Sequence, residues 1–248
     1  MNEFGSAFIE YASSYISLND RVRLKINHTF RVVELCEKIA ISLNMNEEDI
    51  FIAKLCGLLH DIGRFEQWKR FETFKDSESI DHGDLGVEVL KENNFIRVFN
   101  KDEQLDNLLL NTVKYHNKYE VNSDLDDREK LFCNIVRDAD KIDILYLYSI
   151  EDLELNIGND SFSDEIYNSL LAKKQIKKID CKNKTDLLSV SLGFVFDFNF
   201  KHSFEILKYK NYINEIIDIY KHKSLNSSLD IQLEEIRKII NRYIDGRC

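Results

Sequence analysis

The chain has 248 residues, of which 44% are apolar and 31% charged, and 34 basic against 44 acidic residues give a formal net charge of −10. This composition is that of a soluble globular protein and excludes disordered, collagen-like and low-complexity chains. The acidic balance also disfavours binding to a nucleic-acid polymer or an anionic membrane, because both would repel the surface.

Cysteine usage and hydropathy predict a cytoplasmic protein without membrane contact. The five cysteines include no C-x-x-C pair, which fits reduced thiols better than a disulfide framework. Residues 1–15 lack the basic start of a signal peptide. The apolar stretch 187–196 is followed by Asp197 and is too short to span a bilayer. Nothing in the sequence indicates an oligomeric state.

Helical periodicity dominates the first part of the chain. Four residues at helical spacing predict one buried helix face; they are His28, Val32, Leu35 and Ile39. Asn46, followed by three acidic residues, predicts a helix start. The run 50–59 predicts a buried helix, and Gly63 is expected to end it as the residue after the helix C-terminus.

Further helices are predicted over 83–93, 101–116, 128–149, 204–221 and 229–244. Because the chain has no proline, its helices can run without kinks, and turns must use asparagine, aspartate, serine and the 8 glycines.

Two segments are harder to interpret. The lysine-rich span 152–184 is interpreted as a solvated helix face and loop rather than as a rim that attracts anions. The alternating phenylalanines of 194–200 resemble a strand, but their flanks are helical and no partner strand is present, so a helix is expected. The whole chain is therefore predicted to be all-α.

A histidine and an aspartate stand together at the end of an apolar helix, in Leu58-Leu59-His60-Asp61-Ile62-Gly63-Arg64. A carboxylate is rarely buried without a partner, and a metal ion is a natural one. Adjacent side chains diverge by about 100° around a helix, yet they can converge on an ion beyond its end.

A second acidic signal lies at residues 137–143, which overlap the apolar pattern of 131–142. Its carboxylates are Asp138, Asp140 and Asp143. One of them could complete a metal site with His28, His60 and Asp61. His202 and His222 have no acidic neighbour in a repeated pattern and are expected to be ordinary surface or core histidines.

These motifs together resemble the HD-domain superfamily of metal-dependent phosphohydrolases. The resemblance rests on His28, on the string His60-Asp61-Ile62-Gly63-Arg64-Phe65-Glu66-Gln67, on Asp81-His82-Gly83, on Tyr115-His116-Asn117 and on residues 137–143. The string from His60 is similar in particular to a bacterial branch, which has a small apolar residue where Gly83 stands. The resemblance implies a single helical-bundle domain over 1–248, with a metal-binding core at about 20–150 and additional C-terminal helices at about 151–248.

The resemblance also implies a set of metal ligands. The ligands of the first ion would be His28, His60, Asp61 and Asp140. His82 and His116 would bind a second ion, with Asp61 bridging the two. Asp140 is preferred over Asp138 because, like the terminal aspartate of the superfamily it resembles, it follows a small residue and precedes a basic and an aliphatic residue. Imidazole and carboxylate without thiolate suit iron, manganese, nickel, cobalt or magnesium better than structural zinc.

The implied activity is hydrolysis of a small phosphomonoester, nucleotide or phosphodiester, with Asp61 as the catalytic residue. Arg64 is expected to grip a phosphate oxygen. Lys141 would do the same or pair with an acid such as Asp138 or Asp143, and Asp143 is expected to support a metal ligand. Two alternatives share these residues: a di-iron oxygenase resembling myo-inositol oxygenase, and a non-catalytic nucleotide-sensing module.

Overall fold

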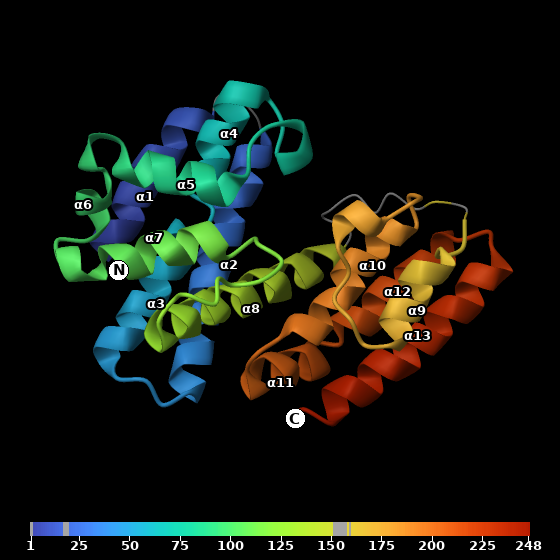
Figure 1. Cartoon of the computed structure of the whole chain (residues 1–248). Coiled ribbons are helices and arrows are strands. Elements are labelled where there is room, and N and C mark those ends of the chain that lie inside the picture. Colours follow the sequence, from blue (N-terminus) through green and yellow to red (C-terminus); the bar gives the residue numbers. More distant parts are fainter. Residues whose placement is uncertain (1, 17–19, 151–157, 159) are drawn as a thin grey trace. The chain divides into compact units, whose positions relative to one another are not determined.

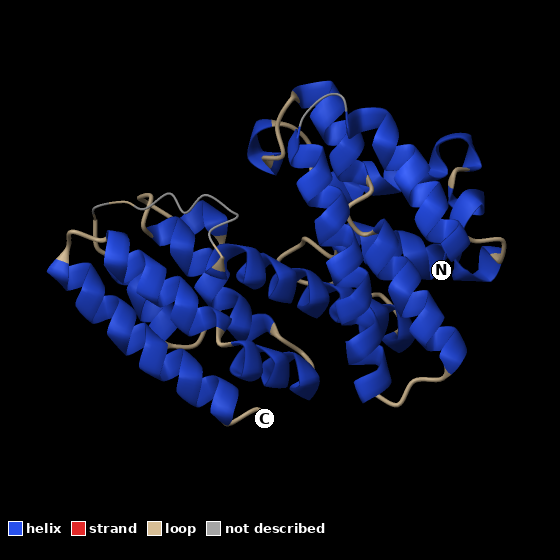
Figure 2. Ribbon diagram, turned by 180° about the vertical axis from the view of Figure 1, so that it is seen from behind, coloured by secondary structure: helices blue, strands red, loops and turns tan. Residues whose placement is uncertain are grey.

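A computed structural model describes residues 2–16, 20–150, 158 and 160–248, and consists of helices joined by loops (Figures 1 and 2). No strand occurs among these residues, so the fold class is all-α, as predicted. The chain divides into two compact units, Met1–Asp140 and Lys141–Cys248. Whether the chain forms a single domain stays a prediction.

The described residues of the first unit form seven complete α-helices and the first part of an eighth. They are α1 (Asn2–Ile16), α2 (Asp20–Ser42), α3 (Glu47–Leu59), α4 (Gly63–Phe71), α5 (His82–Lys91), α6 (Ile96–Phe99), α7 (Asp106–Tyr115) and α8 (Asp127–Ser149). α2 packs along α3, α4 along α5, and α7 contacts both α5 and α3. Buried Phe8 of α1 meets buried Phe65 of α4 edge-on, with ring centroids 5.6 Å apart, and this contact anchors α1.

Side-chain caps fix where two of these helices begin. The side chain of Asn46 accepts a hydrogen bond from the backbone N–H of Asp49 at 2.8 Å, which confirms the predicted start of α3. Asp81 caps α5 in the same way by accepting from the backbone N–H groups of Gly83 and Asp84. This cap makes His82 the first residue of α5.

Glycines allow α4, α5 and α7 to approach one another closely. The prediction that Gly63 ends α3 is wrong, because α3 ends at Leu59 and Gly63 begins α4. A Cβ on Gly63 would lie 2.3 Å from the carbonyl oxygen of His82 and 2.5 Å from the backbone nitrogen of Gly86. A Cβ on Gly83 would lie 2.8 Å from the carbonyl oxygen of Lys114. At these contacts a larger residue would push the helices apart.

In the described part of the chain, four of the six residues with left-handed backbone are asparagines, and none is a glycine. The residues with positive φ are Asn44, Glu72, Asn93, Asn94, Lys173 and Asn211. This confirms the expectation that asparagine builds turns in a chain without proline. Asn211, at φ 60°, also divides the single helix predicted over 204–221 into two, so that prediction is wrong.

The second unit contains the end of α8 and five further helices. They are α9 (Asp164–Leu171), α10 (Asp186–Gly193), α11 (Lys201–Lys210), α12 (Tyr212–Lys223) and α13 (Ser227–Asp245). α13 packs against α9, α11 and α12. The helix expected over 194–200 is a 3₁₀ helix at Phe194–Asp197 followed by extended backbone. Of the polar span 152–184, residues 152–157 and 159 lie outside the described residues. None of the described helices combines the length and apolar character needed to cross a membrane.

Candidate metal centre

The six predicted ligands come from five places in the first unit. His28 lies in the middle of α2, His60 and Asp61 form the turn after α3, and His82 opens α5. His116 directly follows α7, and Asp140 lies on α8. All except Asp140 are almost completely buried, and Asp140 keeps 15% of its side chain exposed. The structure brings these side chains together, although their role as ligands stays a prediction.

The first group of donor atoms contains His28, His60, Asp61 and Asp140. The Nε2 atoms of His28 and His60 are 3.3 Å apart. Oδ2 of Asp61 lies 3.7 Å from Nε2 of His28 and 3.8 Å from Nε2 of His60. Oδ1 of Asp140 lies 3.1 Å from Nε2 of His28, within hydrogen-bond distance. The donor atoms of His28, His60 and Asp61 lie close enough together to hold one ion, and Asp140 lies beside His28.

The second group contains Asp61, His82 and His116. The Nε2 atoms of His82 and His116 are 3.0 Å apart, and Oδ1 of Asp61 lies 3.3 Å from the first and 3.7 Å from the second. The two oxygens of Asp61 therefore face different groups. The side chains of His60 and Asp61, which directly follow α3, bring Nε2 and Oδ2 to 3.8 Å from each other.

Hydrogen bonds place the imidazole protons away from the donor cluster. Nδ1 of His60 donates to the carbonyl oxygen of Gly57, and Nδ1 of His116 to that of Val113, each at 2.7 Å. Nδ1 of His82 lies 2.7 Å from a carboxylate oxygen of Asp76, which accepts from it. The Nε2 atoms of these three rings therefore carry lone pairs.

In the second group, Nε2 of His82, Nε2 of His116 and Oδ1 of Asp61 are therefore all hydrogen-bond acceptors, and no proton lies between them. Burial lowers the pKa of His82 to about 4 and that of His60 to about 3, so both rings are neutral at pH 7. Two lone pairs 3.0 Å apart beside a carboxylate oxygen repel one another unless a cation lies between them. The residues present fit a divalent metal ion.

The two carboxylates of the centre are anionic at neutral pH. Burial alone would raise the pKa of Asp61, but the ammonium of Lys25, whose Nζ is 2.8 Å from Oδ2, helps hold it well below its usual range. Burial would likewise raise the pKa of Asp140, but the hydrogen bond with His28 and the electrostatic interactions with His28 and His60 together hold it below its usual range. Both groups therefore retain the charge that metal binding requires.

Arg64, expected to grip phosphate, is engaged within the protein. Its Nη1 donates to Gln67 Oε1 at 2.8 Å, to the carbonyl oxygen of Phe74 at 2.7 Å and to Asp76 Oδ1 at 2.9 Å. Its Nε lies 3.4 Å from Oδ1 of Asp61. This places Arg64 beside the centre, and its contact with a substrate stays a prediction.

Lys141 and Asp143 belong to the second unit. Lys141 is buried and forms an ion pair with Asp197, a partner that differs from the acids expected for it. Asp143 is also buried. Their predicted roles in substrate binding and ligand support are not tested by these contacts.

Three residues support the centre in ways that the sequence did not predict. Lys25 precedes His28 by one helical turn, a spacing that could have revealed it. Arg137 donates to the carbonyl oxygens of Tyr115 and Tyr119 at 3.1 Å and so holds the chain around His116. Asp76 lies in a loop without periodicity, where no sequence signal points to it.

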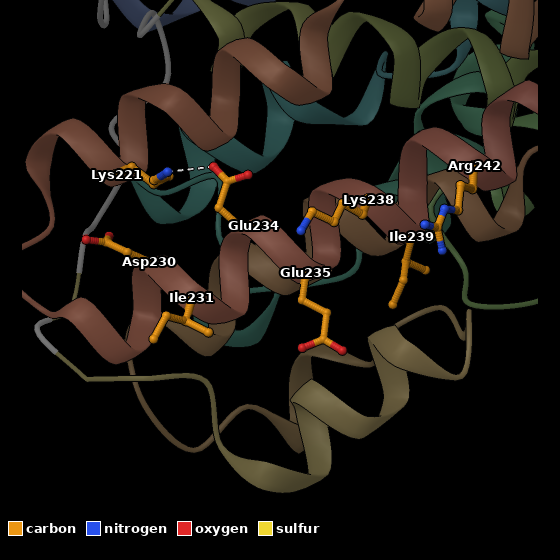
Figure 3. A pocket seen from close by; sticks show the side chains of 8 residues that line it. All are labelled: Lys221, Asp230, Ile231, Glu234, Glu235, Lys238, Ile239 and Arg242. Carbon is orange, nitrogen blue, oxygen red and sulfur yellow. Dashed lines mark hydrogen bonds and ion pairs between the residues drawn. The ribbon is translucent and has the colours of Figure 1, made fainter.

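A hollow in the second unit offers no alternative metal site. This groove of about 730 Å³ is lined by Lys221, Asp230, Ile231, Glu234, Glu235, Lys238, Ile239 and Arg242 (Figure 3). It contains neither histidine nor cysteine, its charges are mixed, and Lys221 is paired with Glu234 at 2.5 Å. His202, expected to be an ordinary histidine, lies 3.1 Å from Glu205.

Comparison with protein families gave a match that covers most of the first unit and the first residues of the second. Residues 26–145 match the family model described as HD domain. All six predicted ligands lie within this range. Comparison with curated proteins and with solved structures gave no match.

Proposed function

Since this chain belongs to the HD-domain family through residues 26–145, we propose that it is a metal-dependent phosphohydrolase acting on a small phosphorylated substrate. The observation that carries the proposal is the pair of donor groups that share Asp61. Its Oδ2 faces His28 and His60, and its Oδ1 faces His82 and His116. Such sharing suits two ions acting on one phosphoryl group.

The protein side of the reaction follows from protonation and charge. His60 and His82 are held neutral by burial, so their Nε2 lone pairs are free to ligate at pH 7. A divalent ion in this site supplies Lewis acidity and a bound water whose pKa falls to about 7. Asp61 and Asp140 bring two negative charges against four positive charges of two divalent ions, so the loaded centre favours a phosphate anion.

Lys25 is a further candidate for contact with the substrate. Its side chain is 26% exposed against 14% for Arg64, so its ammonium is the more accessible of the two cations beside Asp61. Metal ions bound to Asp61 would neutralise its charge. The ammonium of Lys25 could then pair with the phosphate of a substrate instead. A nucleotide or a phosphomonoester would satisfy this requirement.

The first test is the metal content of the protein as purified, measured by elemental analysis without added chelator or metal. We expect about two equivalents per chain, and release of inorganic phosphate from a panel of phosphomonoesters and nucleotides. Asp61→Asn should lose both the metal and the activity, because it removes the carboxylate that both groups share. Asp124→Asn, at an exposed position of the same unit, is the matched control and should retain both.

The same measurements separate the alternatives. Iron as the dominant metal, with oxygen uptake and no phosphate release, would favour the di-iron oxygenase. Tight nucleotide binding without turnover would favour a sensing module. No metal as purified, and none after reconstitution, would refute the proposal.

A further inference from the structure

A carboxylate outside the predicted ligand set supports one of the histidines. Asp76 begins a short 3₁₀ helix, Asp76–Glu78, in the loop between α4 and α5. Its Oδ2 lies 2.7 Å from Nδ1 of His82. Because an ionised carboxylate only accepts hydrogen bonds, this contact places the proton of His82 on Nδ1 and leaves the lone pair on Nε2.

The other oxygen of Asp76 is held by α4. Oδ1 accepts from Nη1 of Arg64 at 2.9 Å and from Nε2 of Gln67 at 2.8 Å. Gln67 is fully buried, and its Nε2 also lies 2.9 Å from the carbonyl oxygen of Ile80. The loop that carries Asp76 is therefore tied to α4 through the carboxylate oxygen that does not contact His82.

The support of His82 differs from that of the other two histidines with a defined proton. His60 and His116 donate to backbone carbonyls, which are neutral. A carboxylate acceptor makes the opposite ring nitrogen a stronger donor to a metal than a carbonyl does. The first group, moreover, can place a proton between His28 and Asp140, which are 3.1 Å apart, whereas the second group holds none.

We infer that Asp76 is a positioning residue for the second donor group: it fixes the tautomer of His82 and selectively strengthens the binding of the ion held with Asp61 and His116. This inference rests on the proposed function, because it requires that the centre binds metal. It assigns Arg64 and Gln67 the role of holding Asp76 in place.

The charge of Asp76 agrees with this role. Partial burial alone would raise its pKa, but the hydrogen bond with His82 and the positive charge of Arg64 hold it well below its usual range. Asp76 therefore stays anionic throughout the range in which histidines ligate metal.

The test is a calorimetric titration of the metal-free full-length chain with Mn²⁺. In Asp76→Ala and in the isosteric Asp76→Asn, we expect one of the two equivalents to bind about 10–100-fold more weakly and the other to be unchanged. Glu78→Gln is the matched control, because Glu78 lies in the same short helix and pairs with exposed Lys75. It should behave as the parent protein.

A second readout does not depend on metal. Nitrogen-15 NMR of the metal-free protein should show His82 as a single tautomer protonated at Nδ1, and a mixture of tautomers in Asp76→Ala. Equal weakening of both equivalents, no weakening, or an unchanged single tautomer in Asp76→Ala would overturn the inference. A parent chain that binds no Mn²⁺ would refute the proposed function and with it the metal part of the inference, while NMR would still decide whether Asp76 holds His82.

Discussion

Different side chains contact the two carboxylate oxygens of Asp61. Oδ1 faces the imidazoles of His82 and His116, while Oδ2 faces Lys25 as well as the first donor group. The ammonium of Lys25 therefore stands where a metal ion would compete with it for the same oxygen. In the free protein it keeps Asp61 ionised, and in the loaded protein it is a cation beside other cations.

Replacing Lys25 by alanine should strengthen metal binding and weaken phosphate binding. Removing the competing charge is expected to lower the Kd for Mn²⁺ several-fold, an effect of about 1 kcal/mol that added salt reduces. Calorimetry with Mn²⁺, and then with inorganic phosphate on the loaded protein, measures both changes. Lys38→Ala on the exposed face of α2 makes the same charge change away from the centre and should alter neither. Weaker metal binding in Lys25→Ala would show instead that the ion pair positions Asp61.

Asparagines take the left-handed conformation that glycines usually supply at helix ends, whereas glycines lie where two helices approach closely. Asn211 and other asparagines form left-handed turns, while Gly63 and Gly83 lie on helices with negative φ, where backbones meet. In a sequence, a glycine that ends a helix and one that permits a close contact look the same. This is why Gly63 was assigned the wrong role, although α3 itself was predicted correctly.

Gly63→Ala should destabilise the protein and disturb the second donor group. The new Cβ would meet backbone atoms of His82 and Gly86, which cannot move aside as a side chain would. Overpacking of this kind costs about 1–3 kcal/mol in the free energy of unfolding, and moving His82 should weaken metal binding. Urea denaturation and a Mn²⁺ titration measure the two effects.

Gly5→Ala is the control for this substitution. Gly5 also lies on a helix, but a Cβ there meets only Phe30, at an ordinary 3.7 Å. Alanine should therefore stabilise α1 by about 0.5–1 kcal/mol. If Gly63→Ala were as stable as the parent protein, the close contact between α4 and α5 would not be as described.

At the scale of the whole molecule, the buried histidines make the metal-free protein sensitive to acid. Unfolded histidine has a pKa of about 6.5, whereas His82 and His60 have values of about 4 and about 3 in the folded chain. Below pH 6.5 the unfolded chain binds protons that the folded chain does not. Stability is therefore lost as the pH falls from about 6.5 toward 4, by up to about 1.4 kcal/mol per pH unit for each histidine.

Chemical denaturation of the chelated protein between pH 7 and 4.5 checks this expectation. His82→Gln removes one of the two histidines and should give a shallower dependence of the free energy of unfolding on pH. A free energy of unfolding that stays constant over this range would contradict the burial of these rings in neutral form.

The six residues of the candidate centre were predicted through the resemblance to the HD-domain superfamily, which rests on motifs such as His60-Asp61 and Ala139-Asp140-Lys141. It could not predict Asp76, whose position depends on Arg64 and Gln67 holding an aperiodic loop against α5. Helix positions followed from apolar periodicity, whereas the break at Asn211 depends on one backbone torsion that periodicity does not reveal. The features that could not be predicted, such as the position of Asp76 and the helix break at Asn211, thus depend on tertiary contacts or on single backbone torsions.

If both donor groups bind metal as proposed, the shared carboxylate would also link their filling. Because Asp61 faces both, an ion in one group would change the free energy of binding in the other, and the change would be reciprocal. Charge repulsion and loss of the free oxygen would oppose a second ion, while displacement of Lys25 and ordering of Asp61 would assist it. Occupancy as a function of metal concentration would then be cooperative, with a sign set by the balance of these terms. The fractions of chains that hold one ion and two ions would then depend differently on the concentration of free metal.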